Sequence, residues 1–250
     1  MKKILFVDLD DTLFQTKRKC HEDEEVVPMA YLADGSPISY ARRSQLSILD
    51  MFQREMIVIP TTARNLDAYG RVRMNFISGA ILNYGGVILG EDGAPDPFWQ
   101  ERVRGLSVVS LSGLNAYRDF FERESHVHDC PLKVRIISDL GVPFYLVAKS
   151  PSGSEEDVGR MANLCRRSFQ SANKTEFRVH DNGNNLSVLP EWLDKRFAVR
   201  YLIEKFRAQH GEILTLGMGD SLSDIGFLGE CHYSVVPATS QIAKTKLEAP

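Results

Sequence analysis

The feature that most constrains the fold is a set of short apolar segments that run directly into polar side chains. Residues 3–9, KILFVDL, carry Asp8 near their end, and residues 56–60, MIVIP, lead into Thr61. Residues 212–220, EILTLGMGD, repeat the pattern and end in a carboxylate. Apolar runs of this length, ended by turn-forming residues, are typical of strands buried inside a sheet. We therefore expect buried strands that each deliver a polar group to one end.

Helices are expected between these strands. The apolar residues of 39–55 recur at helical spacing, with Ser39 as a candidate N-cap, and 193–209 also has the pattern of a helix. A last strand is expected over 233–237. Strands that alternate with helices favour a parallel sheet covered on both faces, and ligands bind such sheets beyond the carboxyl ends of the strands. The predicted fold class is therefore α/β, with the polar strand ends meeting at one edge.

The composition limits the classes of function. The 250 residues are 43% hydrophobic and 25% charged, as in a globular protein with a sizeable core. The net charge of −3 gives no basic footprint for nucleic acid, and no apolar run is long enough to span a membrane. Asp8 interrupts the first apolar stretch too early for a secretory signal peptide. We expect a cytoplasmic protein whose four cysteines are free thiols.

The expected meeting of carboxylates calls for a cation. Asp8, Asp10 and Asp220 would repel one another at a shared sheet edge, and some would stay protonated without compensation. Hard oxygen ligands with no histidine or cysteine nearby favour Mg²⁺ over zinc. Thr61 and Thr62, with the amides that follow them, suit a phosphate oxygen, and a lysine such as Lys195 would supply a further positive charge. The combination predicts Mg²⁺-assisted phosphoryl transfer.

Some of these residues have a plainer interpretation when each is taken alone. Asp11 is best interpreted as a turn residue, Lys195 alone as a surface lysine, and Asp224 alone as a solvated residue of a helix's first turn. The H-x-H-x-C cluster at 126–130 has metal-ligand residue types, but the sequence offers no second ligand cluster, so ordinary strand or loop residues are the simpler interpretation. The ordered combination, rather than any one residue, carries the prediction.

In that order, the residues form four motifs that resemble those of the haloacid dehalogenase superfamily. The first motif, D-x-D-x-T, is present as DLDDT at 8–12, and the fourth, G-D-x-x-x-D, as GDSLSD at 219–224. The second, often T-G-R after an apolar strand, corresponds to TAR at 62–64, with Thr61 as the alternative register. The third is the helix-borne Lys195. The first and fourth motifs are specific, whereas the second and third are weak alone.

The resemblance implies catalytic roles. Asp8 would be the nucleophile that forms an aspartyl-phosphate, and Asp10 the general acid and then the general base. Thr62 and Ala63 would bind the phosphoryl oxygens, and Lys195 would neutralise charge on the nucleophile and the phosphoryl group. Alanine at 63 departs from the usual glycine, which puts the fine positioning of the phosphate in doubt but not the chemistry.

The resemblance also implies a metal site. Asp8, Asp220 and the main-chain carbonyl of Asp10 would hold Mg²⁺, with Asp224 as a direct ligand or as a partner of one. Ser223 stands where many relatives have asparagine. An acid at position 10 is typical of the phosphatases and phosphomutases of this superfamily, and separates them from its dehalogenases and ATP pumps.

The long segment between the second and third motifs predicts a two-domain protein. Residues 1–88 and 187–250 would form a Rossmann-like core with a parallel sheet, and residues 89–186 an inserted α+β cap that selects the substrate. A cap in this place resembles the Cof-like phosphatases and the phosphatases of sucrose phosphate, mannosyl-3-phosphoglycerate and trehalose phosphate. NYGG at 83–86 resembles the N-G-A stretch that precedes the cap in those relatives.

Substrate contacts are expected from the cap and from a hairpin at 26–38, which resembles the flap beside the active site in this superfamily. The hairpin turn is expected at Asp34-Gly35. Polar cap residues are candidates by type alone, and an ordinary surface position is the simpler interpretation for each. These candidates are Lys133, Arg135, Lys149, Arg178, His180, Asn182 and Asn184.

The leading functional hypothesis is a Mg²⁺-dependent phosphatase of a small phosphorylated metabolite, in particular a sugar phosphate, working as a monomer or weak homodimer. A phosphomutase and a catalytically silent homologue that binds a sugar phosphate are the alternatives. A phosphoacceptor signalling domain would be about half as long and would lack D-x-D-x-T. A glycosyltransferase would carry its D-x-D after a nucleotide-binding domain, rather than at residues 8–10.

Overall fold

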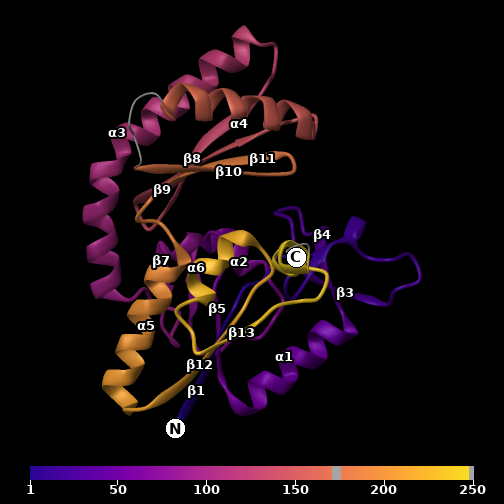
Figure 1. Ribbon diagram of the computed structural model, residues 1–250, viewed down its shortest axis with the longest axis vertical. Coiled ribbons are helices and arrows are strands. Elements are labelled where there is room, and N and C mark those ends of the chain that lie inside the picture. The colour runs from indigo at the N-terminus through magenta and orange to yellow at the C-terminus, as the bar shows by residue number, and fades with distance from the viewer. Residues whose placement is uncertain (171–175, 248–250) are drawn as a thin grey trace. The chain divides into compact units, whose positions relative to one another are not determined.

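The computed structural model describes residues 1–170 and 176–247. The chain divides into two compact units (Figure 1). Unit 1 joins Met1–Gln100 to Asp194–Pro250, and unit 2 is Glu101–Leu193. None of the described helices combines the length and the apolar character that crossing a membrane requires.

The centre of unit 1 is a four-stranded parallel sheet. Its strands, in spatial order, are β13 (Tyr233–Val235), β12 (Ile213–Met218), β1 (Lys2–Val7) and β5 (Ile57–Pro60). The last four residues of β1 are fully buried, as its apolar sequence predicted. Val7 pairs with Pro60 on one side and Met218 on the other, so three strands end at the same level. The α/β prediction is confirmed, and the residues that follow these strands share one edge.

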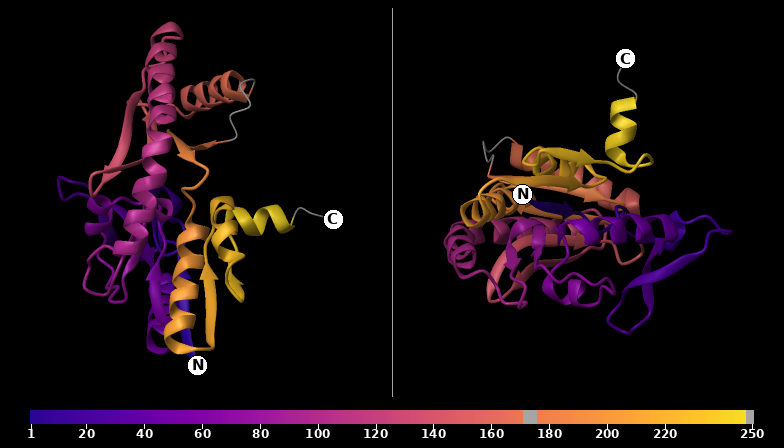
Figure 2. Two further views of the ribbon diagram at one scale, coloured as in Figure 1. Left: turned by 90° about the vertical axis from the view of Figure 1, so that its left-hand side faces the viewer. Right: turned by 90° about the horizontal axis from the view of Figure 1, so that it is seen from below.

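Helices flank this sheet. Helix α5 (Lys195–His210) packs on β12, and Figure 2 shows the two running side by side. Helix α1 (Arg43–Glu55) contacts β5. It begins four residues later than predicted, because Ser39 belongs to the preceding strand and has no capping role. Instead, the side chain of Gln45 accepts a hydrogen bond from the amide of Arg42 and closes the helix start.

The predicted hairpin is present as part of a small three-stranded sheet. Its order is β2 (Gln15–Thr16), β4 (Pro37–Arg42) and β3 (Val26–Tyr31). Gly35 occupies the turn with φ of 82°, a conformation that glycine adopts without strain, and Asp34 accepts from the amide of Ser36 at 2.9 Å.

Beyond β5 the chain makes a short helix, α2 (Leu66–Gly70), where the sequence predicted one lasting to about residue 75. It ends early because the next residues bond to the hairpin. The carbonyl of Arg71 accepts from the amide of Tyr31, and the amide of Arg73 donates to the carbonyl of Met29. These bonds compete with helical ones and take the backbone out of the helix. The strand pair β6 (Ala80–Leu82) and β7 (Val87–Leu89) follows, as predicted.

Unit 2 is an α+β module with an antiparallel sheet. The sheet order is β10 (Phe177–Asn182), β11 (Asn185–Pro190), β9 (Val142–Lys149) and β8 (Lys133–Asp139). Its helices are α3 (Pro97–Val127) and α4 (Glu155–Gln170). A core that includes Leu114, Phe121, Leu146 and Met161 joins helices to sheet. The unit's first boundary falls within α3, and its last strand, β11, is paired with β9 and β10. The cap bounds of 89–186 stay a prediction.

Candidate active site

Asp8 is fixed at the centre of the sheet edge. It follows β1, and its amide donates to the carbonyl of Met218 at 2.8 Å, which extends the pairing of β1 with β12 by one residue. On the other side, the amide of Thr61 donates to the carbonyl of Val7 at 2.7 Å. The side chain of Asp8 is buried. Its backbone therefore has little freedom, and the carboxylate is presented from a rigid strand end.

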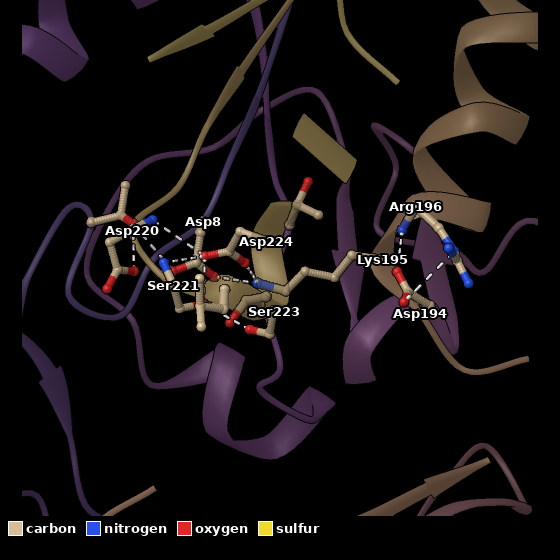
Figure 3. A network of polar contacts seen from close by, with 12 residues as sticks. Asp8, Asp194, Lys195, Arg196, Asp220, Ser221, Ser223 and Asp224 are labelled. Carbon is tan, nitrogen blue, oxygen red and sulfur yellow. Dashed lines mark hydrogen bonds and ion pairs between the residues drawn. The ribbon is translucent and has the colours of Figure 1, made fainter. Parts of the chain in front are cut away.

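Lys195 is the cation of the site. It is the first residue of α5, behind Asp194, whose side chain accepts from the amide of Arg196 and caps the helix. The ammonium donates to Oδ1 of Asp8 at 2.6 Å and to Oδ1 of Asp224 at 2.7 Å (Figure 3). Only 4% of Lys195 is exposed, so its charge is removed from water and balanced by two carboxylates. The surface-lysine interpretation is excluded.

The remaining oxygen of Asp224 is held by the loop that follows β12. Oδ2 accepts from the hydroxyl of Ser221 at 2.8 Å, and from the amides of Ser221 and Asp220 at 3.0 and 3.2 Å. A Cβ on Gly219 would lie 2.8 Å from the Cβ of Asp224, so the loop closes this tightly only with glycine there. Both oxygens of Asp224 are thus engaged by protein donors, so Asp224 is better suited to orient a neighbouring metal ligand than to bind a cation itself.

Three carboxylates form a cluster that suits a hard cation. Asp8, Asp220 and Asp224 each offer an oxygen within 4.8 Å of the others, and all three are buried. The hydroxyl of Thr12 donates to Oδ1 of Asp220 at 3.0 Å and lies 3.4 Å from Oδ2 of Asp8. Three ionised carboxylates beside the one ammonium of Lys195 leave an excess of negative charge. An all-oxygen donor set with that excess fits Mg²⁺.

The pKa values in the cluster show the cost of this arrangement. Burial and the nearby charge of Asp224 raise the pKa of Asp220 to about 6. Burial also raises the pKa of Asp8 well above its usual value, and Lys195 offsets this only in part. Asp224 differs: burial acts to raise its pKa, but Lys195 and the donors of Ser221 hold it below the usual value. A divalent cation at Asp8 and Asp220 would favour their ionised forms.

The second motif, at 62–64, lies on a loop that is held by hydrogen bonds to β6 and to the turn after it. The amide of Thr62 donates to the carbonyl of Ile81 at 2.8 Å, and the carbonyl of Thr62 accepts from the amide of Tyr84 at 3.1 Å. The hydroxyl of Thr62 accepts from the amide of Arg64 at 3.2 Å. Thr61 instead donates its hydroxyl to the carbonyl of Ile59, within its own strand. This difference favours Thr62 over Thr61 as the phosphate ligand, and Ala63 follows it in the same loop.

The NYGG stretch forms the support for that loop. Asn83, Tyr84 and Gly85 all have positive φ, at 52°, 56° and 98°, which produces a tight left-handed turn. The amide of Asn83 donates to the carbonyl of Arg64 at 2.9 Å. A Cβ on Gly85 would lie 2.8 Å from the carbonyl oxygen of Asp194. Glycine therefore lets the turn pack closely against the start of α5, whose first residue is Lys195.

Asp10 stands apart from the buried cluster. Its carboxylate is bound by both arms of the Arg64 guanidinium, Nε to Oδ2 at 2.8 Å and Nη2 to Oδ1 at 2.7 Å. Although burial acts against the charge of Arg64, the hydrogen bond to Asp10 raises the pKa of the guanidinium. The carboxylate of Asp10 is absent from the cluster of possible metal ligands, and the role inferred for its main-chain carbonyl stays a prediction. Asp11 has a φ of 62°, as its interpretation as a turn residue requires.

The structure thus brings together four of the predicted site residues, Asp8, Lys195, Asp220 and Asp224. Sequence reasoning missed three partners: Thr12, Ser221 and Arg64. Thr12 and Arg64 were visible as the last letters of D-x-D-x-T and T-G-R, and Ser221 as the residue after Asp220. Their functions depend on contacts that no spacing reveals.

The other candidate residues, in the 126–130 cluster and in the inserted unit, have no comparable network of buried charges among the described residues. Among the described residues, the aspartate cluster is the one group with the geometry of a metal site, and 126–130 supplies none. Lys133 and Lys149 lie opposite each other in the register of β8 and β9, and both are exposed. Arg178 donates to the carbonyl of Leu193 at 2.8 Å. The side chain of Asn182 lies outside the described residues, and the substrate contacts of His180 and Asn184 stay predictions.

Comparisons with known proteins agree with the motifs. A sequence model of the sucrose-6F-phosphate phosphohydrolase family matches residues 157–248. A search of curated proteins by sequence found no match.

Several solved structures share the fold at low sequence identity. One is the sucrose-phosphatase of Synechocystis sp. PCC6803 in complex with sucrose and phosphate, 16% identical over 99% of this chain and 87% of that one, with a TM-score of 0.54. A second is a protein of Thermoplasma acidophilum, 16% identical over 98% and 89%, with a TM-score of 0.57. A third is the trehalose-6-phosphate phosphatase of Aspergillus fumigatus, 16% identical over 96% and 84%, with a TM-score of 0.51.

The parallel sheet with its inserted module, shared with these structures, is the haloacid dehalogenase fold. The family-model match covers residues 157–248, and it agrees with the resemblance to sucrose-phosphatase-like members of the haloacid dehalogenase superfamily that the four motifs indicate.

The balance of charge at Lys195 gives a stability prediction. Lys195→Met leaves Asp8 and Asp224 buried without their counter-ion, and the expected loss in the free energy of unfolding at pH 7 is about 3 kcal/mol. The control Lys3→Met removes an exposed ion pair with Glu55 and should cost less than about 1 kcal/mol. Urea denaturation measures both, and equal losses would contradict the role given to Lys195.

Proposed function

We propose that this chain is a Mg²⁺-dependent phosphatase of small phosphorylated metabolites, with a sugar phosphate as substrate and an aspartyl-phosphate as intermediate. The buried network of Lys195 with Asp8 and Asp224, at the carboxyl edge of the parallel sheet, carries the proposal. A buried carboxylate, an ammonium group and an acid cluster that suits Mg²⁺ meet at this edge, and this combination supports phosphoryl transfer. The match to the sucrose-6F-phosphate phosphohydrolase family supports the substrate class.

In the first step, a carboxylate oxygen of Asp8 attacks the phosphorus. The bond from phosphorus to the leaving oxygen breaks, the electron pair stays on that oxygen, and Asp10 donates the proton that completes the alcohol. Lys195 balances the charge of the attacking carboxylate, and the hydroxyl of Thr62 and the amide of Ala63 donate to the phosphoryl oxygens. The products are the free alcohol and a phosphoryl group on Asp8.

In the second step, water attacks the phosphorus of the aspartyl-phosphate and gives its proton to Asp10. The bond between phosphorus and Asp8 breaks, which regenerates the carboxylate and releases inorganic phosphate. Asp8 and Asp220 would hold Mg²⁺. Asp224 would orient the loop that carries Asp220, through its bonds to the amides of Asp220 and Ser221, and would also hold Lys195. When bound, the ion supplies positive charge to the phosphoryl oxygens and lowers the repulsion between them and the carboxylates. We propose that the inserted unit, Glu101–Leu193, selects the substrate.

The general test is a release assay for inorganic phosphate over a panel of phosphorylated metabolites, with and without a sugar-bisphosphate activator. We expect hydrolysis of one or more sugar phosphates and net phosphate release. A product in which the phosphoryl group has moved to another hydroxyl of the sugar would instead establish a phosphomutase. Binding without turnover of any ester would establish the silent homologue.

The nucleophile has a matched control in the same loop. Asp8→Asn removes the attacking carboxylate and its charge pairing with Lys195. Without a nucleophile the covalent route is lost, so the rate of aryl-phosphate hydrolysis should fall by at least about 10³-fold. Asp11→Asn changes an adjacent aspartate that pairs with Lys19, and asparagine tolerates its left-handed backbone, so this variant should keep the wild-type rate. Full activity of Asp8→Asn would contradict the proposed mechanism.

The metal prediction has a readout that does not depend on turnover. Mg²⁺ should raise the midpoint of thermal unfolding of the wild type, because an ion that binds only the folded state stabilises it. Asp220→Asn should abolish that rise, whereas Asp23→Asn, at an exposed position, should retain it. In activity assays EDTA should inactivate the enzyme and Mg²⁺ restore it. Restoration by zinc alone would contradict the hard-cation assignment.

A further inference from the structure

The ion pair between Arg64 and Asp10 joins a fixed side chain to an accessible one. The side chain of Arg64 is 15% exposed, whereas that of Asp10 is 49% exposed. Two parallel hydrogen bonds of 2.8 and 2.7 Å join the guanidinium fork to the two carboxylate oxygens. This bidentate geometry fixes the plane of the carboxylate as well as its position.

Arg64 is itself held from several sides. Its guanidinium lies 5.1 Å from the ring of Phe14, which is fully buried. Its Nη1 lies 3.4 Å from the carbonyl of Ala68. Its own backbone is bonded at both ends, the amide to the hydroxyl of Thr62 and the carbonyl to the amide of Asn83. Arg64 is therefore fixed in place by its surroundings, and it can in turn fix the orientation of the more exposed Asp10.

We infer that Arg64 is a positioning residue that holds the carboxyl group of Asp10 in the orientation for proton exchange with the leaving oxygen and with water. The inference rests on the proposed phosphatase function. Each carboxylate oxygen has two lone-pair directions, so a carboxyl group gripped through one side still presents the other side to a substrate. A fork gives orientation that a single point charge at this position lacks.

Two other roles for Arg64 make different kinetic predictions. If Arg64 bound the phosphoryl group directly, its removal would lower kcat/KM for every phosphate ester by a similar factor. If it were merely a surface ion pair, its removal would change little, because exposed pairs contribute weakly. A positioning role predicts dependence on the leaving group, since only a poor leaving group needs a proton from Asp10.

The decisive experiment compares two substrates, glycerol 2-phosphate with its alkoxide leaving group and 2,4-dinitrophenyl phosphate with a phenolate that departs unprotonated. For Arg64→Gln we expect kcat/KM to fall by about 10²-fold on the alkyl ester, the scale of a misplaced acid. On the aryl ester kcat/KM should stay within a few-fold, because it reports only formation of the aspartyl-phosphate. Its kcat should still fall, with a burst of dinitrophenolate, because water attack also needs Asp10.

Further variants separate positioning from fold and charge. Arg64→Lys keeps the charge without the fork and should recover only part of the activity on the alkyl ester. Asp10→Asn should reproduce the leaving-group pattern, and the double variant should be no slower than Asp10→Asn alone, since the two residues act as one unit. Arg71→Gln is the control: Arg71 also pairs with an aspartate, Asp67, and donates to the carbonyl of Tyr31, yet it should leave both substrates unaffected.

The outcomes distinguish this inference from the proposed function. Equal losses on both esters, or additive losses in the double variant, would overturn the positioning role while leaving the phosphatase intact. Wild-type protein that with Mg²⁺ hydrolyses neither these two esters nor any sugar phosphate of the panel would overturn the phosphatase assignment, and the positioning role with it. Thermal unfolding of each variant shows whether a loss comes from a disturbed fold, and Arg64→Lys then serves as the test variant in place of Arg64→Gln.

Discussion

The structure of the site depends on one buried ammonium group between two carboxylates. Lys195 bonds to Asp8 and Asp224 at 2.6 and 2.7 Å, and all three side chains are removed from water. Isolated burial of any of them would be strongly unfavourable, so each is tolerable only because the others are in place. The three come from three separate segments: the end of β1, the start of α5 and the loop after β12. This interaction therefore requires the whole of unit 1 to be folded.

The sheet supplies the precision that this interaction needs. Val7 is in register with Pro60 and Met218, so the residues after three strands start from one level. Two glycines then allow the backbone to approach closely where a side chain would intrude: Gly219 against Asp224, and Gly85 against Asp194. The rigid strand ends place the carboxylate of Asp8, and the turns around them place its partners. Asp10, on the exposed side, lacks such burial and takes its orientation from Arg64.

The sequence allowed the sheet, Asp8 and Asp220 to be predicted, because apolar strands that end in polar residues leave a local pattern. Lys195 and Asp224 were predicted only from the ordered combination of motifs. The same logic failed for Ser39, whose residue type suits a helix cap but whose backbone is paired in β4. The helix after Thr62 was also drawn too long, because the hydrogen bonds of Arg71 and Arg73 to the hairpin join segments about 40 residues apart. Arg64 was seen as a motif letter, but its bond to Asp10 spans 54 positions and has no signature in spacing. Long-range competition for backbone and side-chain partners explains each of these differences.

The contact of Gly85 with Asp194 has a consequence for how such chains diversify. These two residues lie before and after the inserted unit, yet they touch within unit 1. The position of Lys195 is thus set by a junction that closes on itself, whatever length of chain is inserted between its two sides. Because the two ends of the insertion meet within unit 1, we expect a change in the length of the insertion to leave Lys195 beside Asp8. Gly85 is the residue that permits this junction, since a Cβ there would lie 2.8 Å from the carbonyl oxygen of Asp194.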